Sequence, residues 1–204
     1  MMALALAAYA GAQGPPPPEV QVCWGYGCAE HARVRIPAAD WAKVVALLAP
    51  PAPDPAAERR RLREAIARLD AAIGRLTPVG RDLGGSQPWG GLPGQQDCID
   101  ESLTTEALLR ALEEAGLLQW HRVAGRARRA PRVFDVHWTA VVEERGSGRA
   151  YAVDPWFGDQ GEPPVVQPLP EWLRGRAPAE LPPRRRSRAL AARLLWSEDE
   201  DEPF

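Results

Sequence analysis

The chain changes character once, at Gly116, and this order of patterns most constrains its fold. Before that glycine, apolar residues recur at helical spacing in three stretches, residues 39–49, 56–76 and 99–115. After it come three extended runs, residues 117–123, 133–143 and 149–153. Gly146-Ser147-Gly148 predicts a hairpin turn between the last two runs. Helices followed by antiparallel strands predict an α+β fold, with N-terminal helices packed on a small antiparallel sheet.

Composition and charge set the broad class. The 204 residues, 45% of them hydrophobic, suit one globular domain, which we place at residues 19–176. The 25 basic and 27 acidic residues nearly cancel, so no nucleic-acid partner is expected. Residues 177–204 carry a basic run followed by an acidic run and are predicted to be a charged, flexible tail.

The N-terminal residues 1–18 bear on location. Residues 2–12 are apolar but too short to cross a bilayer, which takes about 20 residues, so no transmembrane segment is expected. They resemble the second half of a secretory signal, with Ala8-Tyr9-Ala10 or Ala10-Gly11-Ala12 as the cleavage site, although a basic n-region is missing. Residues 14–18 then read as a polyproline spacer. A periplasmic or secreted location is predicted, with a cytoplasmic protein as the alternative.

The chain has three cysteines, of which two are close in sequence. Cys23 and Cys28 suit a short disulfide loop if the protein is exported. The alternatives are a zinc half-site completed by His31, a redox pair, or two free buried thiols. No second cysteine pair supports a zinc site, so neither a metal nor a cofactor is expected. Cys98 is left without a partner.

Cys98 lies where a helix is predicted to begin. Asp97 occupies the N-cap position, and the helix dipole and free backbone amides there favour a thiolate. Asp100 and Glu101 follow in the first turn, and negative charge beside a thiol opposes its ionisation. Either these carboxylates point away as caps, or the thiol is weakly reactive.

A nucleophilic thiol also needs an imidazole and a group that orients it. His137 opens the apolar run of the longest predicted strand, and Asp154 closes the next strand. Pairing about Ser147 sets residue 157 opposite His137, so Asp154 falls within a few positions, an offset that a bulge or longer loop can absorb.

Together these residues carry a resemblance. Asp97-Cys98 leads into a helix with Leu108-Leu109, Leu112 and Gly116, followed by a strand at Val123, then His137-Trp138 and Asp154-Pro155-Trp156. Over residues 95–157 this resembles the core of the transglutaminase-like superfamily of papain-fold cysteine enzymes. The resemblance implies a papain-like core in a catalytic domain, with Cys98 as nucleophile, His137 as general base and acid, and Asp154 as the orienting carboxylate. It implies hydrolysis or transfer of a protein or peptide amide through a thioester.

Other residues have smaller expected roles. The oxyanion donors would be the Cys98 amide and a side chain, Gln96 foremost, or else Gln95 or Trp89. Trp138 and Trp156 would shape an acyl pocket, and Asp159 and Glu162 would lie at its rim. His121 and His31 are expected to be structural.

Two rival interpretations stay open. In the first, Cys98 is an ordinary core thiol and the chain is a non-catalytic module. Such a module would bind a peptide or protein through the cleft or through residues 84–94. Alternatively, the acids near Cys98 would hold a divalent metal together with His137 and Asp154. An Asp154 side chain turned away from His137 would favour the binding module.

Overall fold

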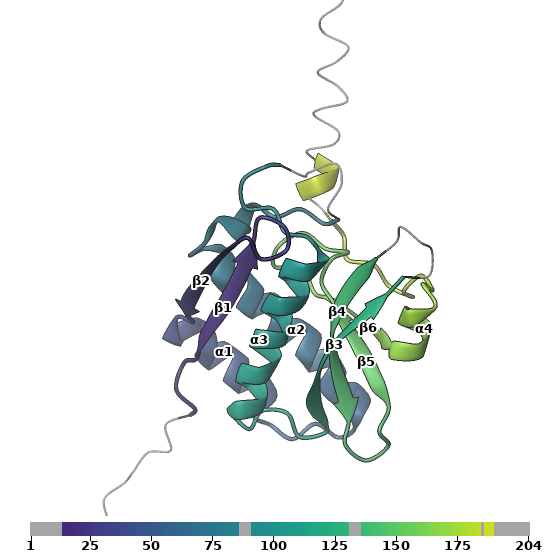
Figure 1. The fold of residues 1–204 in the computed structure, drawn as a ribbon. Helices are drawn as coiled ribbons and strands as arrows, with labels where there is room; N and C mark the ends of the chain where they lie inside the picture. Colours follow the sequence, from purple (N-terminus) through teal and green to yellow (C-terminus); the bar gives the residue numbers. More distant parts are fainter. Residues whose placement is uncertain (1–13, 86–90, 131–135, 185, 190–204) are drawn as a thin grey trace, which may run out of the picture.

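The computed structural model describes residues 14–85, 91–130, 136–184 and 186–189 (Figure 1). Within them the fold is mixed α+β, as predicted, with helices and two small antiparallel sheets. The three long helices are α1 (Ala38–Leu48), α2 (Pro55–Gly74) and α3 (Cys98–Glu114). Each begins one residue before its predicted start. Their apolar faces explain why they could be predicted. Asp54 caps α2 by accepting from the Ala57 N–H.

The larger sheet follows α3 in the chain. Its order is β3-β4-β5-β6, and every neighbouring pair is antiparallel. The strands are β3 (His121–Arg129), β4 (His137–Glu144), β5 (Ala150–Asp154) and β6 (Val165–Pro168). The short helix α4 (Leu169–Leu173) follows β6. Neither β6 nor α4 was predicted, because four- and five-residue elements carry little periodicity.

One predicted strand was misplaced. Residues 117–123 were expected to be extended, but β3 begins only at His121. The N–H groups of Gln119 and Trp120 donate to the buried carboxylate of Glu58 on α2 rather than to a strand. For the predicted strand at 133–143, residues 131–135 lie outside the described residues, and β4 begins at His137.

A second sheet precedes the helices and was not predicted. It is a hairpin of β1 (Glu19–Trp24) and β2 (Glu30–Arg35), joined by the loop that contains Cys28. Its buried side chains Val20 and Val22 join the main core. Another short element, the 3-10 helix η1 (Pro78–Arg81), lies between α2 and α3.

Helix α3 occupies the centre of the molecule. Figure 1 shows it between the β1-β2 hairpin and the larger sheet, with α1 and α2 behind. Leu109 and Leu112 of α3 pack in one core with Ile66 of α2, Ala140 of β4 and Val22 of β1. The start of α3 therefore lies where the hairpin loop meets the sheet. No described helix is both long and apolar enough to cross a membrane.

The first part of the predicted tail is attached to the domain. The N–H groups of Arg186 and Ser187 donate to Asp159, and that of Arg184 donates to Glu162. Ser187 is buried. Asp159 and Glu162, expected at a cleft rim, hold this segment and also line a small cavity beside α3.

Candidate active site

Cys98 is the first residue of α3, one position before the predicted start, and it is partly exposed. Asp97 is the N-cap, and its Oδ1 accepts from the N–H of Ile99 at 3.0 Å and of Asp100 at 2.9 Å. Asp100 completes a capping box by accepting from the N–H of Asp97 at 3.1 Å. The N–H of Cys98 lies in the first turn of α3, where backbone amides have no intrahelical acceptor. It is therefore placed to serve as an oxyanion donor.

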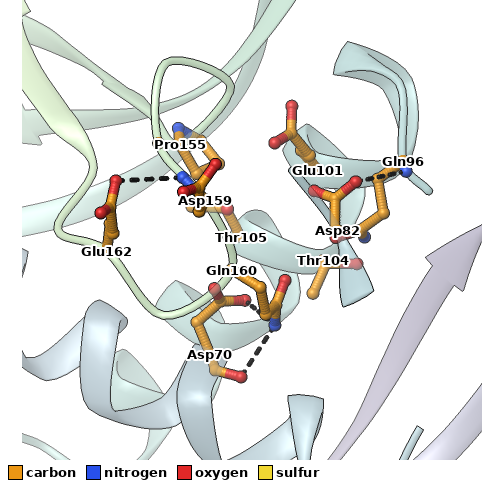
Figure 2. Close-up of a pocket in the computed structure, with 11 residues that line it drawn as sticks. Asp70, Asp82, Gln96, Glu101, Thr104, Thr105, Pro155, Asp159, Gln160 and Glu162 are labelled. Carbon is orange, nitrogen blue, oxygen red and sulfur yellow. Dashed lines mark hydrogen bonds between the residues drawn. The ribbon is translucent and has the colours of Figure 1, made fainter. Parts of the chain in front are cut away.

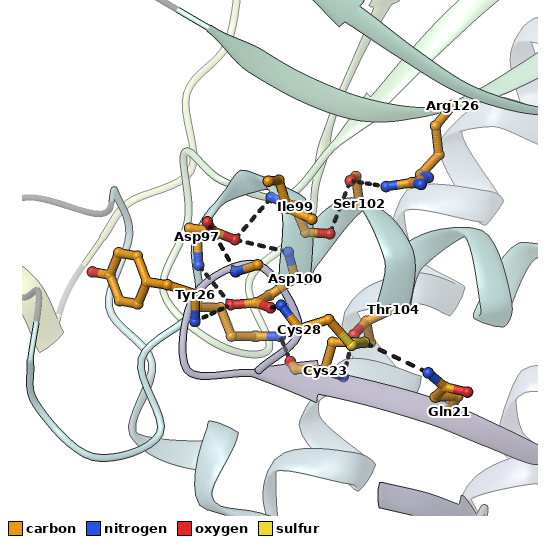
Figure 3. The surroundings of a disulfide bond; sticks show 12 residues. Gln21, Cys23, Tyr26, Cys28, Asp97, Ile99, Asp100, Ser102, Thr104 and Arg126 are labelled. Atoms are coloured by element: carbon orange, nitrogen blue, oxygen red, sulfur yellow. Dashed lines mark hydrogen bonds between the residues drawn. A yellow bond between two sulfur atoms is a disulfide. The ribbon is translucent and has the colours of Figure 1, made fainter. Parts of the chain in front are cut away.

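The acids next to Cys98 are turned towards backbone donors. Besides its capping bonds, Asp97 accepts from the Gly27 N–H at 3.1 Å, and Asp100 accepts from the Tyr26 N–H at 2.8 Å. Figure 3 shows both carboxylates directed at the loop between β1 and β2. Asp97 and Asp100 therefore act as caps, the first alternative raised by the sequence, whereas Glu101 does not.

Glu101 lies in a small acidic cavity beside α3 (Figure 2). Asp70 and Asp82 also line this cavity. Burial, helped by the charges of Asp82 and Asp154, raises the pKa of Glu101 well above its usual range, and burial does the same for Asp82. One oxygen of Glu101 has no hydrogen-bond partner within the described residues. Burial thus favours the neutral form of Glu101, which reduces the negative charge beside Cys98.

His137 and Asp154 come together on neighbouring strands. His137 Nε2 lies 2.7 Å from Asp154 Oδ2, and both side chains are buried. The strands pair with Ala140 opposite Val153, so the register differs by one residue from pairing about Ser147. The pairing is centred between Gly146 and Ser147, and the Glu144 N–H donates to the Arg149 carbonyl at the turn. Asp154 is therefore a diagonal neighbour of His137, within reach of a side-chain contact.

The surroundings of His137 favour its charged form. Burial acts to lower the pKa of His137, but the hydrogen bond to Asp154 and the interaction with Cys98 outweigh it and raise the pKa to about 9. Because Asp154 holds Nε2, the ring nitrogen left for Cys98 is Nδ1.

Trp172 of α4 is a site residue that sequence reasoning missed. Its Nε1–H donates to Asp154 Oδ2 at 2.7 Å, the oxygen that also binds His137. Its fully buried ring lies 5.6 Å from the His137 ring, and the Arg129 guanidinium covers it at 4.6 Å. No local pattern marks this tryptophan, since only the chain path through β6 and α4 brings it to Asp154. It fixes the Asp154 carboxylate.

The other aromatic candidates differ in position. Trp156 lies edge-on to His137 with ring centroids 5.0 Å apart, so it borders the site. Trp138 follows His137 in the strand and therefore points to the opposite face. It lies 5.1 Å from the Arg126 guanidinium, which donates to Ser102 of α3. Trp89 lies outside the described residues.

The two glutamines before Cys98 are buried and bound elsewhere. Gln96 Nε2 donates to the Cys23 carbonyl at 2.7 Å, and Gln95 Nε2 donates to the Arg81 carbonyl at 2.7 Å. These bonds hold the chain that leads into α3, and the oxyanion role of either glutamine stays a prediction.

The remaining residues singled out in the sequence have structural roles. Cys23 and Cys28 form a disulfide, which replaces the zinc half-site and the free thiols considered as alternatives. His31 pairs across the hairpin from Cys23. His121, for which the sequence offered no partner, is buried with Nδ1 2.8 Å from Glu58. No group of three or more metal-ligating side chains converges anywhere in the described residues.

Comparison with known proteins adds no family to this site. No protein-family model matches the chain, and neither a curated protein nor a solved structure matches it. What Cys98, His137 and Asp154 do is therefore inferred from their own geometry.

We expect His137 to titrate with a midpoint of about 9, far above the ordinary 6.5. Asp154→Asn removes the negative charge at Nε2, so the midpoint should fall towards the ordinary value. Histidine ring signals followed by NMR against pH measure both, with His31 on the outer hairpin as the internal comparison. A wild-type midpoint at the ordinary value would contradict the geometry.

The same shift predicts how stability depends on pH. The folded protein holds the His137 proton more tightly than the unfolded chain, so the stabilisation is complete below pH 6.5 and is lost as pH rises through about 9. Thermal unfolding of the wild type should therefore lose stability over that window, and Asp154→Asn should flatten the slope.

Proposed function

We propose that the protein is a cysteine-dependent enzyme that hydrolyses or transfers an amide acyl group of a protein or peptide through a thioester on Cys98. The observation that carries the proposal is the His137–Asp154 bond of 2.7 Å, made by an imidazole that also interacts with the partly exposed thiol of Cys98 at a helix start. These are the parts that an activated thiol nucleophile requires.

The proposal includes a papain-like or transglutaminase-like core. In support, the thiol starts the central helix α3, and the imidazole and carboxylate lie on the adjacent strands β4 and β5. The three residues follow one another along the chain as Cys, His and Asp, the order that the resemblance implies. The strands of His137 and Asp154 are neighbours in the antiparallel sheet.

In the first half-reaction the Cys98 thiolate attacks the amide carbonyl carbon. The carbonyl oxygen becomes an oxyanion, for which the N–H of Cys98 is available. As the carbon–nitrogen bond breaks, the His137 imidazolium gives its proton to the departing amine, leaving a thioester and a neutral imidazole.

In the second half-reaction His137 takes a proton from water, which attacks the thioester carbonyl. The carbon–sulfur bond breaks, the carboxylic acid leaves, and the thiolate–imidazolium pair is restored. An amine in place of water gives transfer instead of hydrolysis. Asp154 and Trp172 keep the imidazole in one orientation throughout.

A periplasmic or secreted location accompanies this function. The Cys23–Cys28 disulfide supports it, because disulfides persist mainly in oxidising compartments.

The acidic crowding at Cys98 motivated the alternative of a non-catalytic binding module, and an Asp154 turned away from His137 would have favoured it. Asp154 is instead hydrogen-bonded to His137. Of the crowding acids, Asp97 and Asp100 are engaged with backbone N–H groups. Both observations favour the enzyme.

Labelling of Cys98 tests the proposed function. All other cysteine sulfur is in the disulfide, so iodoacetamide reports on Cys98 alone. We expect labelling at neutral pH at least ~10-fold faster than a small free thiol, because the site stabilises the thiolate. p-Nitrophenyl acetate should leave an acetyl group on Cys98, detectable by mass spectrometry, that Cys98→Ala lacks. Ordinary labelling together with no acyl adduct would overturn the proposal.

A further inference from the structure

The loop closed by the disulfide, residues 23–28, lies directly against the start of α3 (Figure 3). Its last four residues all have left-handed backbones, with φ of 81° at Gly25, 71° at Tyr26, 69° at Gly27 and 60° at Cys28. Tyrosine and cysteine rarely adopt this region, because Cβ meets the following carbonyl. The loop therefore needs contacts that hold it in this shape.

Those contacts are made with the residues on both sides of Cys98. The N–H groups of Tyr26 and Cys28 donate to the Asp100 carboxylate at 2.8 and 2.5 Å, and that of Gly27 donates to Asp97 at 3.1 Å. On the other side of the thiol, the Gly25 N–H donates to the Gln95 carbonyl at 3.1 Å. Gln96 in turn donates to the Cys23 carbonyl.

The loop thus has two effects on the thiol. It fixes the chain that enters α3, and it supplies three N–H donors to carboxylates within two residues of Cys98. Without those donors, the Asp97 and Asp100 charges would be less neutralised and would oppose a thiolate. An opened loop should therefore loosen the helix start and lower the reactivity of Cys98 at once.

We propose that the Cys23–Cys28 disulfide is a redox lock on Cys98. While the disulfide is intact, the loop keeps the start of α3 ordered and Cys98 reactive. When a dithiol reduces the disulfide, the helix start loosens and Cys98 becomes less reactive. This rests on the proposed function only for its effect on catalysis, since the coupling between loop and helix is structural. It assigns to the loop a role in regulation beyond stabilising the hairpin.

Reduction follows ordinary thiol–disulfide exchange. Cys28 is partly exposed and Cys23 is buried, so the thiolate of the dithiol attacks the Cys28 sulfur and expels Cys23 as a thiolate. Gln21 Nε2 lies 3.9 Å from that leaving sulfur and can donate to it. The second thiol of the dithiol then resolves the mixed disulfide. The dithiol becomes a disulfide, and both cysteines end as thiols.

The first test removes the disulfide permanently. In Cys23→Ser/Cys28→Ser we expect iodoacetamide to label Cys98 at least ~10-fold more slowly than in wild type. Hydrogen exchange of the amides at residues 97–101 should be at least ~10-fold faster, because the helix start opens more often. Arg35→Gln, which breaks only the exposed ion pair to Glu19 in the same hairpin, is the matched control and should change neither.

The second test uses the wild-type chain in dithiothreitol buffers. The labelling rate of Cys98, read by peptide mapping, should fall in step with the fraction of reduced Cys23 and Cys28. The double serine variant should not respond, which separates loop reduction from any direct effect on Cys98. If the loop is fully reduced and the hydrogen-exchange rates of the amides at residues 97–101 are unchanged, the proposal is wrong.

Asp100→Asn keeps the test decisive if the double variant fails to fold. It retains the disulfide but replaces one accepting oxygen with an amide donor, so it should speed exchange at the helix start. Unchanged exchange in this variant would count against the lock. If Cys98 is unreactive in every form, the proposed function fails, while the exchange measurements still decide whether the loop controls the helix.

Discussion

Replacement of His137 by glutamine should lower amide hydrolysis or acyl transfer by roughly 100- to 10,000-fold, the usual contribution of a general acid and base. Glutamine keeps hydrogen-bonding capacity towards Asp154 but can neither hold the proton that pairs with a thiolate nor pass it to the leaving amine. Acyl-enzyme formation with p-nitrophenyl acetate and alkylation of Cys98 should slow together. Both are measured on purified protein at neutral pH.

His31→Gln is the matched control for this substitution. His31 lies on β2 of the outer hairpin, away from β4, and its replacement should leave both rates unchanged. A His137→Gln protein that acylates Cys98 at the wild-type rate would remove the imidazole from the mechanism.

The largest effect on stability is expected from Glu58→Ala. The buried Glu58 carboxylate accepts from the N–H groups of Gln119, Trp120 and His121, and also bonds the His121 ring. Burial acts to raise the pKa of Glu58, but these bonds prevail and lower it, so the group is an anion at neutral pH. Truncation leaves several buried donors without an acceptor and should cost about 3–5 kcal/mol of unfolding free energy.

Chemical denaturation measures this loss, and Glu64→Ala provides its control. Glu64 lies on the same helix but pairs with Arg68 on the exposed surface, so its removal should cost less than about 1 kcal/mol. Equal losses in the two variants would show that Glu58 does not join α2 to the start of β3.

The elements that sequence predicted well are those that local patterns determine. The long helices carry apolar residues at regular spacing, and Asp97 marks the start of α3 by its capping chemistry. The β1-β2 hairpin was missed because its left-handed loop includes Tyr26 and Cys28, residue types that do not signal such a turn. The misplaced start of β3 depends on Glu58, more than sixty residues earlier in the chain.

The candidate site divides in the same way. The hairpin between β4 and β5 is a local structure, so the nearness of His137 and Asp154 could be predicted to within one residue of register. Trp172 reaches Asp154 only through the pairing of β6 with β5, and the Tyr26–Asp100 contact joins residues 74 positions apart in the chain. Such contacts depend on tertiary packing, which single-sequence patterns do not encode.

The way His137 is held has a kinetic consequence. Asp154 binds one ring nitrogen of His137, and the rings of Trp156, Phe157 and Trp172 surround the imidazole. The imidazole therefore keeps one orientation and does not flip during a reaction cycle. Under the proposed mechanism, both proton transfers then pass through Nδ1, at one place in the site. The departing amine must vacate that place before water or an acceptor amine can occupy it. The enzyme would therefore release its first product before admitting the second reactant, which is a ping-pong order.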